Sequence, residues 1–595
     1  MQLARLRGRG LSVECIEKAV SGSIKNIEEN QSSSFVIFGE PQSGKTEMMI
    51  CLTARLLDLK YDLVIHLLND SVQLLEQNLD RFKRSDLAPA AKNFSEILDP
   101  DISLKSGQHI IFAKKNGKDL DKLLEKTKNI RRKVIIDDEA DYASPNAKIN
   151  KGEVTKINNL ISKLISNDGV YIGVTATPAR LDLNNTFDND NENWVRFPAH
   201  KNYTGQESFF PLETNIPYRL NLLNDTQDDP KFIREAIFRF MITVAYLNLH
   251  ENNEAQKNYS MLIHTSGKRE DHSIDRKTIE KIFQDLTNDR SVKLDSYLKK
   301  IFDLTKKLYP SSNAQQITEF IYSNASRFAI TVMNSDRDKG TDFTAATNPA
   351  SLFTIVVGGN IVSRGVTFEN LLSMFFTRTT KTKLQQDTYI QRARMFGSRG
   401  KYLRHFELTI PESLYQDWHR CFVFHKLALE SIVQGRGSPI WLADKRIAVA
   451  ANNSIDRARV QFDRGEMSFS IFKFEKAVDE ILDDTARPAI ERLKRMQALV
   501  GDAAVPEYLL SYISRVSPNG SSSVAIHTSQ SIENYKDADQ TKIDRIKGFM
   551  GTNQLKKFPS ALHHFKVFTN ARGNARLLYK FQGSIQFIKN LKNDS

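Results

Sequence analysis

An apolar run that leads directly into a glycine-containing loop constrains this chain more than any other feature. The run is FVIF, residues 35–38, and the loop is GEPQSGKT, residues 39–46. The two glycines allow the backbone to curl with its N–H groups pointing inward, and residues 47–59 continue as a helix whose N-terminus faces the loop. This order of strand, loop and helix predicts a triphosphate site lined by Gly39, Gln42, Ser43, Gly44, Lys45 and Thr46.

Two side chains of this loop carry the expected chemistry. Lys45 is placed to reach the β and γ phosphates of ATP, and the hydroxyl of Thr46 is placed to bind Mg²⁺. A glycine pattern of this kind also arises by chance in roughly a few per cent of chains of this length, so the loop alone leaves the assignment open. The expected cofactors are ATP and Mg²⁺, provided that a second motif supports the loop.

The stretch RRKVIIDDEADYAS, residues 131–144, supplies that support. It reads as a short β-branched strand followed by clustered carboxylates, among them Asp138, Glu139 and Asp141. Carboxylates at the carboxyl end of a buried parallel strand lie where ligands bind, and their mutual repulsion raises their pKa values unless a cation compensates. We assign Asp138 to Mg²⁺, through water, and Glu139 to polarising the water that attacks the phosphoanhydride.

Short apolar runs alternate with helical patterns in this part of the chain. DLVIHLL (62–68) and QHIIFAKK (108–115) are each followed by a helical pattern, which predicts a parallel sheet covered on both faces. A further run, YIGVTATPAR (171–180), ends in Thr175 and Thr177, whose hydroxyls are suited to hydrogen-bond the acidic cluster and report the state of the γ-phosphate. An ordinary strand-ending turn before a proline is the alternative interpretation.

A second set of strands follows the helical stretch 230–250. Its apolar runs are residues 259–266, 328–335, 353–360 and 371–377. A Lys-rich helical stretch, about 276–324, separates the first two runs, and its charges are expected to face solvent. These runs predict a second α/β domain, which carries no phosphate loop of its own.

Two motifs of this second domain place arginines beside glycines and short polar residues. GGNIVSRGVTFENL (358–371) contains Arg364, and TYIQRARMFGSRGKY (388–402) contains Arg392, Arg394 and Arg399. A guanidinium supplied across a cleft to a transferring γ-phosphate stabilises the charge of the transition state and makes hydrolysis depend on domain closure. The alternative is that these arginines face solvent, as most arginines on helices do.

The motifs, taken in order, resemble those of a known class of motor. A phosphate loop, DEAD, TATP, a glycine–arginine motif and a glutamine–arginine motif resemble the core of superfamily 2 helicases, in which two RecA-like domains clamp ATP. More narrowly, IIDDEADYAS, YIGVTATPAR, SMLIHTS, GGNIVSRGVTFENL and the spacing Q..R.FG.R of residues 391–399 resemble the Z1 domain family of bacterial endonucleases, which are often associated with restriction or antiphage systems. The resemblance covers roughly residues 30–460.

The resemblance implies roles for residues in both domains. It implies ATP contacts at Lys45 and Thr46, catalysis at Asp138 and Glu139, and coupling between the domains at Thr175 and Thr177. In the second domain it implies further coupling or nucleic-acid residues and finger arginines: Ser363, Arg364, Gly365, Thr367, Gln391, Arg394 and Arg399.

The last motif departs from the family's pattern. Ala393 stands where glycine is usual, Met395 where tryptophan is usual, and Ser398 where tyrosine is usual. These departures leave open which of the two arginines, Arg394 or Arg399, reaches the phosphate.

Positive charge is concentrated at the C-terminal end. The chain has a net charge of +13, and residues 541–595 hold 11 basic residues against two acidic ones, mixed with aromatic residues. Cations beside aromatic rings suit phosphate contact and base stacking. The alternation in residues 577–589 instead indicates a hairpin with one buried face, which would place part of the aromatic residues in the core. His563 and His564 are expected at a nucleic-acid contact or at the surface.

Cysteine spacing and hydropathy indicate the cellular compartment to expect. The three cysteines, Cys15, Cys51 and Cys421, are too widely spaced for a disulfide framework or a cysteine-rich zinc site. The basic start lacks the apolar core of a signal peptide, and no apolar run approaches the roughly 18 residues that span a bilayer. We therefore expect a cytoplasmic protein without a membrane partner.

The expected fold class is α/β, with two RecA-like parallel-sheet domains and a C-terminal α+β region. The expected divisions are an N-terminal segment (1–30), RecA-like domain 1 (31–215), RecA-like domain 2 (216–420, with a helical insertion at about 270–325), a helical region (421–515) and a basic C-terminal domain (516–595).

These observations favour an ATP-dependent translocase or helicase. Its expected partners are nucleic acid, DNA rather than RNA, and other proteins of a bacterial defence system, including a nuclease. An ATP-dependent endonuclease is one alternative, although we find no constellation of carboxylates with lysine, or of histidine with asparagine, that would form a nuclease centre. A nucleotide-switched scaffold that does not translocate is the other.

Overall fold

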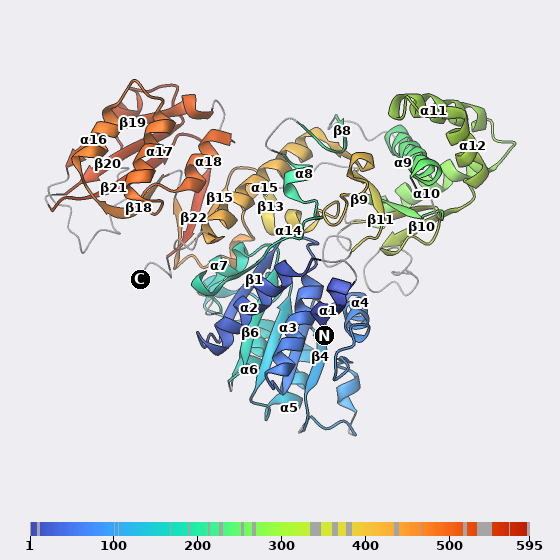
Figure 1. The fold of residues 1–595 in the computed structure, drawn as a ribbon, viewed down its shortest axis with the longest axis horizontal. Coiled ribbons are helices and arrows are strands. Elements are labelled where there is room, and N and C mark those ends of the chain that lie inside the picture. Colours follow the sequence, from blue (N-terminus) through green and yellow to red (C-terminus); the bar gives the residue numbers. More distant parts are fainter. Residues whose placement is uncertain are drawn as a thin grey trace.

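The computed structural model describes most of the chain, in three connected bodies (Figure 1). Three of the candidate coupling residues, Ser363, Arg364 and Gly365, lie outside the described residues. The residues that are not described are 1, 9–11, 100, 105, 167, 188–190, 212–214, 225–229, 252–254, 265–268, 334–346, 360–366, 377–382, 434–438, 464–465, 516–519, 532–549, 571 and 592–595.

A seven-stranded parallel sheet forms the centre of the first domain. Its strand order is β3-β4-β2-β5-β6-β1-β7, and every neighbouring pair runs parallel. The carboxyl ends of β1, β5 and β6 therefore meet at one edge of the sheet. The strands are β1 (Ser34–Gly39), β2 (Leu63–Leu68), β3 (Lys92–Asn93), β4 (His109–Lys114), β5 (Lys133–Asp138), β6 (Val170–Thr175) and β7 (Val195–Phe197).

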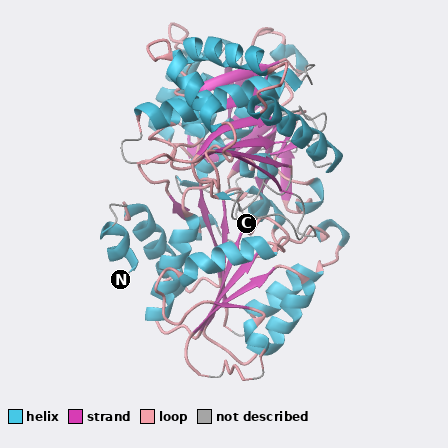
Figure 2. Ribbon diagram, turned by 90° about the vertical axis from the view of Figure 1, so that its right-hand side faces the viewer, coloured by secondary structure: helices cyan, strands magenta, loops and turns pink. Residues whose placement is uncertain are grey.

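Helices cover both faces of this sheet (Figure 2). In β2, Leu63, Ile65 and Leu67 belong to the same apolar cluster as α5 and α6, whereas Val64 and Leu68 belong to the cluster of α2, α3 and α4. Continuous apolar strands of this kind are typical of a parallel sheet buried on both sides. The helices are α1 (Gln2–Gly8), α2 (Glu14–Glu28), α3 (Lys45–Asp58), α4 (Val72–Lys83), α5 (Gly117–Thr127), α6 (Lys156–Ile165) and α7 (Ala179–Asn184).

The second domain is built on a six-stranded parallel sheet. Its order is β10-β11-β9-β12-β14-β8. The predicted fold class is therefore confirmed: two parallel-sheet α/β domains are followed by an α+β region. The strands are β8 (Arg219–Leu223), β9 (Tyr259–His264), β10 (Phe328–Met333), β11 (Phe353–Gly358), β12 (Leu371–Phe376) and β14 (Glu407–Pro411).

Helices precede, interrupt and follow this second sheet. The short α8 lies between the two domains, and α10, α11 and α12 are inserted between β9 and β10, where they pack with α9. Ion pairs on this insertion, such as Arg276 with Glu280, agree with a solvated charged face. The helices are α8 (Gln206–Phe209), α9 (Pro230–His250), α10 (Arg269–Thr287), α11 (Leu294–Leu308), α12 (Ala314–Asn324), α14 (Gln386–Gln391) and α15 (Glu412–Val433).

In its described residues, the C-terminal region combines two small sheets with four helices. One sheet has the order β15-β22-β17 and the other β18-β21-β20-β19, while β13 (Leu384–Gln385) pairs with β16 (Ile447–Ala448). The stretch expected to be a helical region thus also contains strands. The remaining elements are β15 (Ile440–Ala443), β17 (Val460–Asp463), β18 (Glu466–Lys473), β19 (Val524–Ser531), β20 (His563–Thr569), β21 (Asn574–Phe581), β22 (Gln586–Asn590), α16 (Lys476–Asp483), α17 (Ala489–Val500), α18 (Glu507–Arg515) and α19 (Thr552–Leu555).

The hairpin expected within residues 577–589 is wrong. β21 pairs with β18 and β20, whereas β22 leaves that sheet and pairs with β15 and β17. β21 does pair antiparallel with a neighbour in the sequence, but that neighbour is the preceding strand β20, whereas the partners of β22 lie far before it in the chain. Alternation fixes which face of a strand is buried, and it does not identify the partner strand.

Most aromatic residues of the described tail are in the core. Phe565, Phe568, Tyr579, Phe581 and Phe587 are all buried, so their rings are not available to stack on bases in this arrangement. The expectation for the histidine pair is also wrong, because neither residue is at the surface. His563 lies 2.8 Å from the Tyr579 hydroxyl, and His564 lies 3.1 Å from His527.

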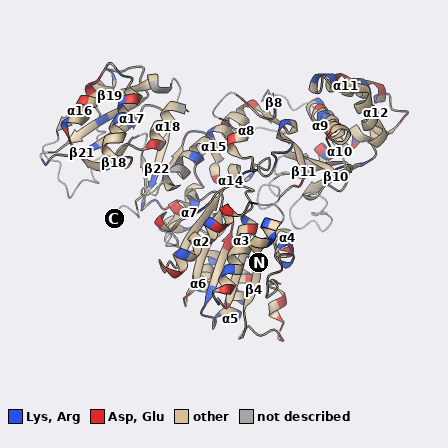
Figure 3. Cartoon of the chain, in the orientation of Figure 1, with Lys and Arg blue, Asp and Glu red and all other residues tan. Residues whose placement is uncertain are grey.

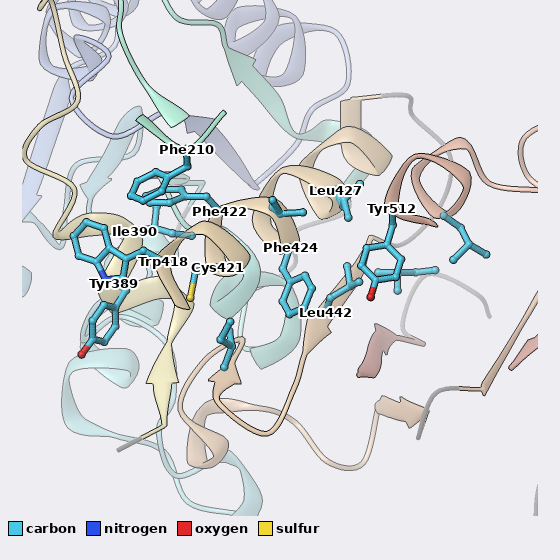
Figure 4. Packing of buried hydrophobic residues seen from close by; sticks show 14 of the residues in the cluster. Phe210, Tyr389, Ile390, Trp418, Cys421, Phe422, Phe424, Leu427, Leu442 and Tyr512 are labelled. Carbon is cyan, nitrogen blue, oxygen red and sulfur yellow. The ribbon is translucent and has the colours of Figure 1, made fainter. Parts of the chain in front are cut away.

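Aromatic packing along α15 joins the second domain to the C-terminal region (Figure 4). Phe422 stacks on Phe210, which precedes the second sheet, with ring centroids 4.8 Å apart. Trp418 contacts Tyr389 of α14, and further along the helix Phe424 approaches Tyr512 of α18. Helix α15 thus contributes side chains to one apolar core that the second domain and the C-terminal region share.

The final strand also docks on the first domain. Trp441 of β15 donates a hydrogen bond of 2.7 Å to Asp182 of α7, and Asn590 of β22 donates to the carbonyl of Asp182. Around these bonds lies an apolar cluster that contains Phe38 from β1 and Ile588 from β22. The helix that follows TATP is therefore held by the C-terminal region.

Charged residues of both signs are distributed over the helices of the outer bodies (Figure 3). The Lys566 ammonium of β20 is buried and donates to Gln530. Not every cation of the basic tail is therefore free to contact phosphate. Within the described ranges, no helix is both long and apolar enough to cross a bilayer.

The buried His66 predicts a pH dependence of stability in the first domain. Its ring stacks on Phe112 and lies against Phe82, Nε2 lies 3.0 Å from the Thr53 hydroxyl, and burial lowers its pKa to about 3. The unfolded chain binds a proton at an ordinary histidine pKa of about 6.5, so this stability is complete above that pH and is lost as the pH falls toward about 3.

Replacing this histidine should remove that dependence. Between pH 7 and pH 5, the wild type should lose about 2 kcal/mol more of its free energy of unfolding than His66→Phe, since one proton is taken up only by the unfolded state. Urea unfolding at the two pH values measures this difference. Equal losses in the two proteins would show that His66 is not held neutral in the fold.

Candidate nucleotide-binding site

The phosphate loop lies between the carboxyl end of β1 and the start of α3. Gly44 has φ +95°, in the left-handed region that favours glycine, and it immediately precedes the first residue of α3. Gly39 is required for a different reason, because a Cβ atom there would lie 2.8 Å from the carbonyl oxygen of Phe197. Both predicted glycines therefore have a physical requirement, one for conformation and one for close approach.

The Lys45 ammonium lies among oxygen atoms. Its Nζ donates to the carbonyls of Glu40, at 2.9 Å, and Gly39, at 3.4 Å. Burial lowers the pKa of Lys45, while the carboxylates of Glu139 and Asp138 act in the opposite direction. The loop lysine and the acidic pair thus lie close enough to share one charged ligand.

The acidic pair sits at the end of β5. Asp138 is the last residue of the strand, and its Oδ1 accepts a hydrogen bond of 3.0 Å from the N–H of Glu139. Burial first, and then the charge of Glu139, raises the pKa of Asp138 to about 7. A carboxylate this strongly perturbed is stabilised by a bound cation.

The residues present fit a magnesium ion that is bound largely by its nucleotide. Among the described residues, no three His, Cys, Asp or Glu side chains converge as metal ligands. Mg²⁺ commonly uses only one or two protein ligands and completes its shell with water and phosphate oxygens. Thr46 and Asp138 are donors of that type, and the contacts that the Thr46 hydroxyl makes with described residues are long, at 3.5 Å to Asn78 and to Arg81.

One buried carboxylate connects three motifs from two domains. Asp141 accepts hydrogen bonds from the hydroxyls of Thr175, at 2.7 Å, and Thr177, at 2.9 Å. Gln391, the last residue of α14 in the second domain, donates to both oxygens of Asp141 and to the Thr177 hydroxyl, at 3.0–3.1 Å. The turn that carries the acidic pair is therefore bonded directly to the second domain.

The two candidate finger arginines differ in position. Arg394 lies near enough to Lys45 for its charge to contribute to the lowering of the lysine's pKa. The Arg399 guanidinium instead donates to the carbonyls of Met395, Phe368 and Arg394 and to the Tyr402 hydroxyl, all within the second domain. Of the two, Arg394 is the one beside the phosphate loop.

The sequence analysis did not identify residues 203–204, which connect the phosphate loop to the second domain through hydrogen bonds. The Tyr203 hydroxyl donates to the carbonyl of Pro41, and Thr204 forms a two-way backbone bridge with Gly397. Gln42 donates to the carbonyl of Arg394 at 3.4 Å. No sequence pattern marks Tyr203 or Thr204, because their partners are set by the tertiary arrangement.

Thr367, the described member of the glycine–arginine motif, is half-buried and precedes β12 in the chain.

A cavity of about 530 Å³ adjoins the start of the loop. It is lined by Gly39 and Glu40 of the loop, by Arg196, by Tyr203 and by Lys426 of α15. Lys45, Thr46, Asp138 and Glu139 do not line it. This cavity is therefore distinct from the place where the lysine and the acidic pair converge.

Comparison with known protein families gives two matches. Residues 13–180 match the type III restriction enzyme, res subunit, and residues 232–435 match the Z1 domain. The resemblance to the Z1 domain family is confirmed. The Z1 match lies in the second domain and α15, whereas a restriction-type helicase-like model accounts for most of the first domain.

Solved structures to which this chain is similar include three that are bound to nucleic acid. Dbp5 of S. cerevisiae, bound to RNA and ADP BeF3, is 12% identical, with a TM-score of 0.39 over 72% of this chain and 93% of that one. The Type ISP restriction-modification enzyme LlaBIII, bound to DNA, is 14% identical, with a TM-score of 0.37 over 73% and 31% of the two chains. The helicase Lhr of Mycobacterium smegmatis, bound to ssDNA and AMP-PNP, is 12% identical, with a TM-score of 0.38 over 73% and 49%. The comparison with curated proteins gives no match.

The positions of the two arginines predict different mutant phenotypes. Arg394→Ala should reduce ATP turnover by on the order of 10³-fold while ATP binding persists, as expected for a group that stabilises the transferring phosphoryl. Arg399→Ala removes four hydrogen bonds inside the second domain, so its main effect should be a lower melting temperature.

Steady-state ATPase assays and thermal melts on the two variants separate these effects. A variant Arg394→Ala that turns over like the wild type, beside an inactive but fully stable Arg399→Ala, would reverse the assignment.

Proposed function

We propose that this protein is an ATP-dependent nucleic-acid translocase or helicase of the Z1 type. The observation that carries the proposal is the bonding of Asp141 to Thr175 and Thr177 of the first domain and to Gln391 of the second. In a site built in this way, the hydrogen bonding of the acidic turn depends on whether the two domains are in contact. Hydrolysis that depends on closure is how a nucleotide drives movement.

The chemistry follows from the residues at the carboxyl edge of the first sheet. Lys45 and the N–H groups of the loop bind the phosphates of ATP, and Glu139 accepts a proton from the attacking water. Bound Mg²⁺ would be held by Thr46, Asp138 and phosphate oxygens, and would neutralise charge on the transferring group. Arg394, supplied from the second domain, stabilises the same charge when the cleft closes.

DNA is the proposed nucleic acid, and restriction-type defence is the proposed setting. Support comes from the two family matches, a restriction-enzyme subunit and the Z1 domain. Coupling residues of the second domain, Thr367 among them, together with Ser363, Arg364 and Gly365, are proposed to link strand contact to the nucleotide. A partner protein is proposed to supply any nuclease activity, since the sequence offers no constellation of carboxylates with lysine, or of histidine with asparagine, that we would assign to a nuclease centre.

ATPase stimulation by a panel of nucleic acids tests the proposal. Double-stranded DNA, single-stranded DNA, forked DNA and RNA are added to purified protein with ATP and Mg²⁺, and at least one DNA ligand should raise the rate by about tenfold or more. Glu139→Gln should bind ATP and DNA without turnover, whereas Lys45→Ala should lose ATP binding.

Three results would contradict the proposal in different ways. A rate indifferent to every nucleic acid would favour a nucleotide-switched scaffold. Cleavage of DNA that survives Glu139→Gln would reveal a separate nuclease centre. Equal loss of ATP binding in Lys45→Ala and Glu139→Gln would show that the roles of the loop and the acidic pair are misassigned.

A further inference from the structure

A completely buried lysine lies directly beneath the acidic pair. Lys115 follows the last residue of β4, and its own N–H donates to the carbonyl of Leu68 at the end of β2. Its side chain has no exposed surface. An ammonium group buried to this degree requires acceptors for its three protons and a compensating charge.

The three protons of Lys115 are directed to three backbone carbonyls of one turn. Nζ donates to the carbonyl of Asp138 at 2.9 Å, of Glu139 at 2.9 Å and of Tyr142 at 3.0 Å. A lysine ammonium has three N–H donors on one atom, so its hydrogen-bonding capacity is fully used by this turn. No other side chain offers three donors from a single point, and the planar guanidinium of arginine would not reproduce the arrangement.

The compensating charge comes from Asp137, which is also completely buried. One oxygen of Asp137 lies 2.9 Å from Nζ of Lys115. The other accepts hydrogen bonds from the hydroxyls of Ser144, at 2.5 Å, and Tyr171, at 2.7 Å. Asp137 therefore neutralises the lysine, while the hydrogen bonds of the lysine hold the backbone.

The turn needs such support because its backbone is unfavourable. Glu139 has φ +51° and Ala143 has φ +65°, both in the left-handed region that non-glycine residues rarely adopt. Backbone of this kind persists only where the surroundings hold it. The conformation of Glu139 decides where its carboxylate points, and the hydrogen bond from Lys115 to its carbonyl fixes that conformation.

We propose that Lys115 is a positioning residue for ATP hydrolysis, which holds the turn bearing Asp138 and Glu139 through three carbonyl hydrogen bonds. The proposal rests on the proposed function of Glu139 as the group that activates water. It gives a role in turnover to a side chain that faces away from the ligand. Its expected signature is a loss of kcat with little change in the affinity for nucleotide.

Two variants separate the carbonyl bonds of Lys115 from the packing around Asp137. Lys115→Met/Asp137→Asn removes the ion pair and the three carbonyl bonds together without leaving a buried charge, whereas Ser144→Ala removes one hydrogen bond to Asp137 and leaves Lys115 and its bonds in place. Lys114→Met serves as the matched control, because this neighbouring lysine is partly exposed and pairs with Asp70 and Asp119. Turnover is measured per nucleotide-binding site, titrated with a non-hydrolysable analogue, so that any unfolded fraction does not count.

The double variant should lose on the order of 10²-fold in kcat while its affinity for the analogue stays within about threefold, since the acids are displaced and the phosphate loop is not. Ser144→Ala and Lys114→Met should keep kcat within about threefold of the wild type. Equal losses in Ser144→Ala and the double variant, or wild-type turnover in the double variant, would overturn the proposal and leave Lys115 as a structural partner of Asp137 alone.

A parallel assay of Glu139→Gln distinguishes this proposal from the function on which it rests. If Glu139→Gln is inactive and the double variant turns over normally, only the role of Lys115 is wrong. If Glu139→Gln hydrolyses ATP at the wild-type rate, the proposed function of the acidic pair is itself wrong.

Discussion

The hydrogen bonds to Asp141 are the interaction on which the rest of this structure depends. A buried carboxylate that lost its donors would carry a large desolvation cost, and each hydrogen bond to a charged group is worth about 1.5–3 kcal/mol. Thr175, the last residue of β6, and Thr177, in the turn after it, supply part of that stabilisation, and Gln391 of the second domain supplies a further part. The acidic turn therefore gains hydrogen bonds when the domains meet, which links catalytic geometry to domain position.

Two different kinds of contact join the first domain to the rest of the chain. At the nucleotide side they are polar, and include Gln391 on Asp141 and Gln42 on the carbonyl of Arg394. At the side of β22 they include an apolar cluster with Phe38, Trp441 and Ile588. Polar groups regain hydrogen bonds from water on separation, whereas apolar surface does not. Opening should therefore occur at the nucleotide side, with the apolar contact as its pivot.

The sequence could predict those candidate site residues that lie close together within one motif. The loop glycines, Lys45 and the acidic pair sit at strand ends, where apolar runs and short-range spacing are informative. The partner of β22 was not predictable, because β15 and β17 lie far before it in the sequence, and the burial of His563 depends on packing with Tyr579 and Tyr512, which local sequence does not mark. Lys115 does not belong to a recognisable motif either. The backbone carbonyls that accept its hydrogen bonds are present in every residue, so the sequence does not mark them. The choice between Arg394 and Arg399 likewise needed three-dimensional contacts.

The distance between the two α/β domains, with and without nucleotide, tests the central claim most directly. Dyes on cysteines introduced at Lys128 and Val292, both exposed, report that distance by energy transfer, and the native cysteines are buried. A non-hydrolysable ATP analogue should narrow the distance distribution in the otherwise wild-type protein and fail to do so in Gln391→Ala. If the analogue leaves the distance distribution unchanged in the otherwise wild-type protein, or narrows it equally in Gln391→Ala, the hydrogen bonds to Asp141 do not link nucleotide binding to domain position.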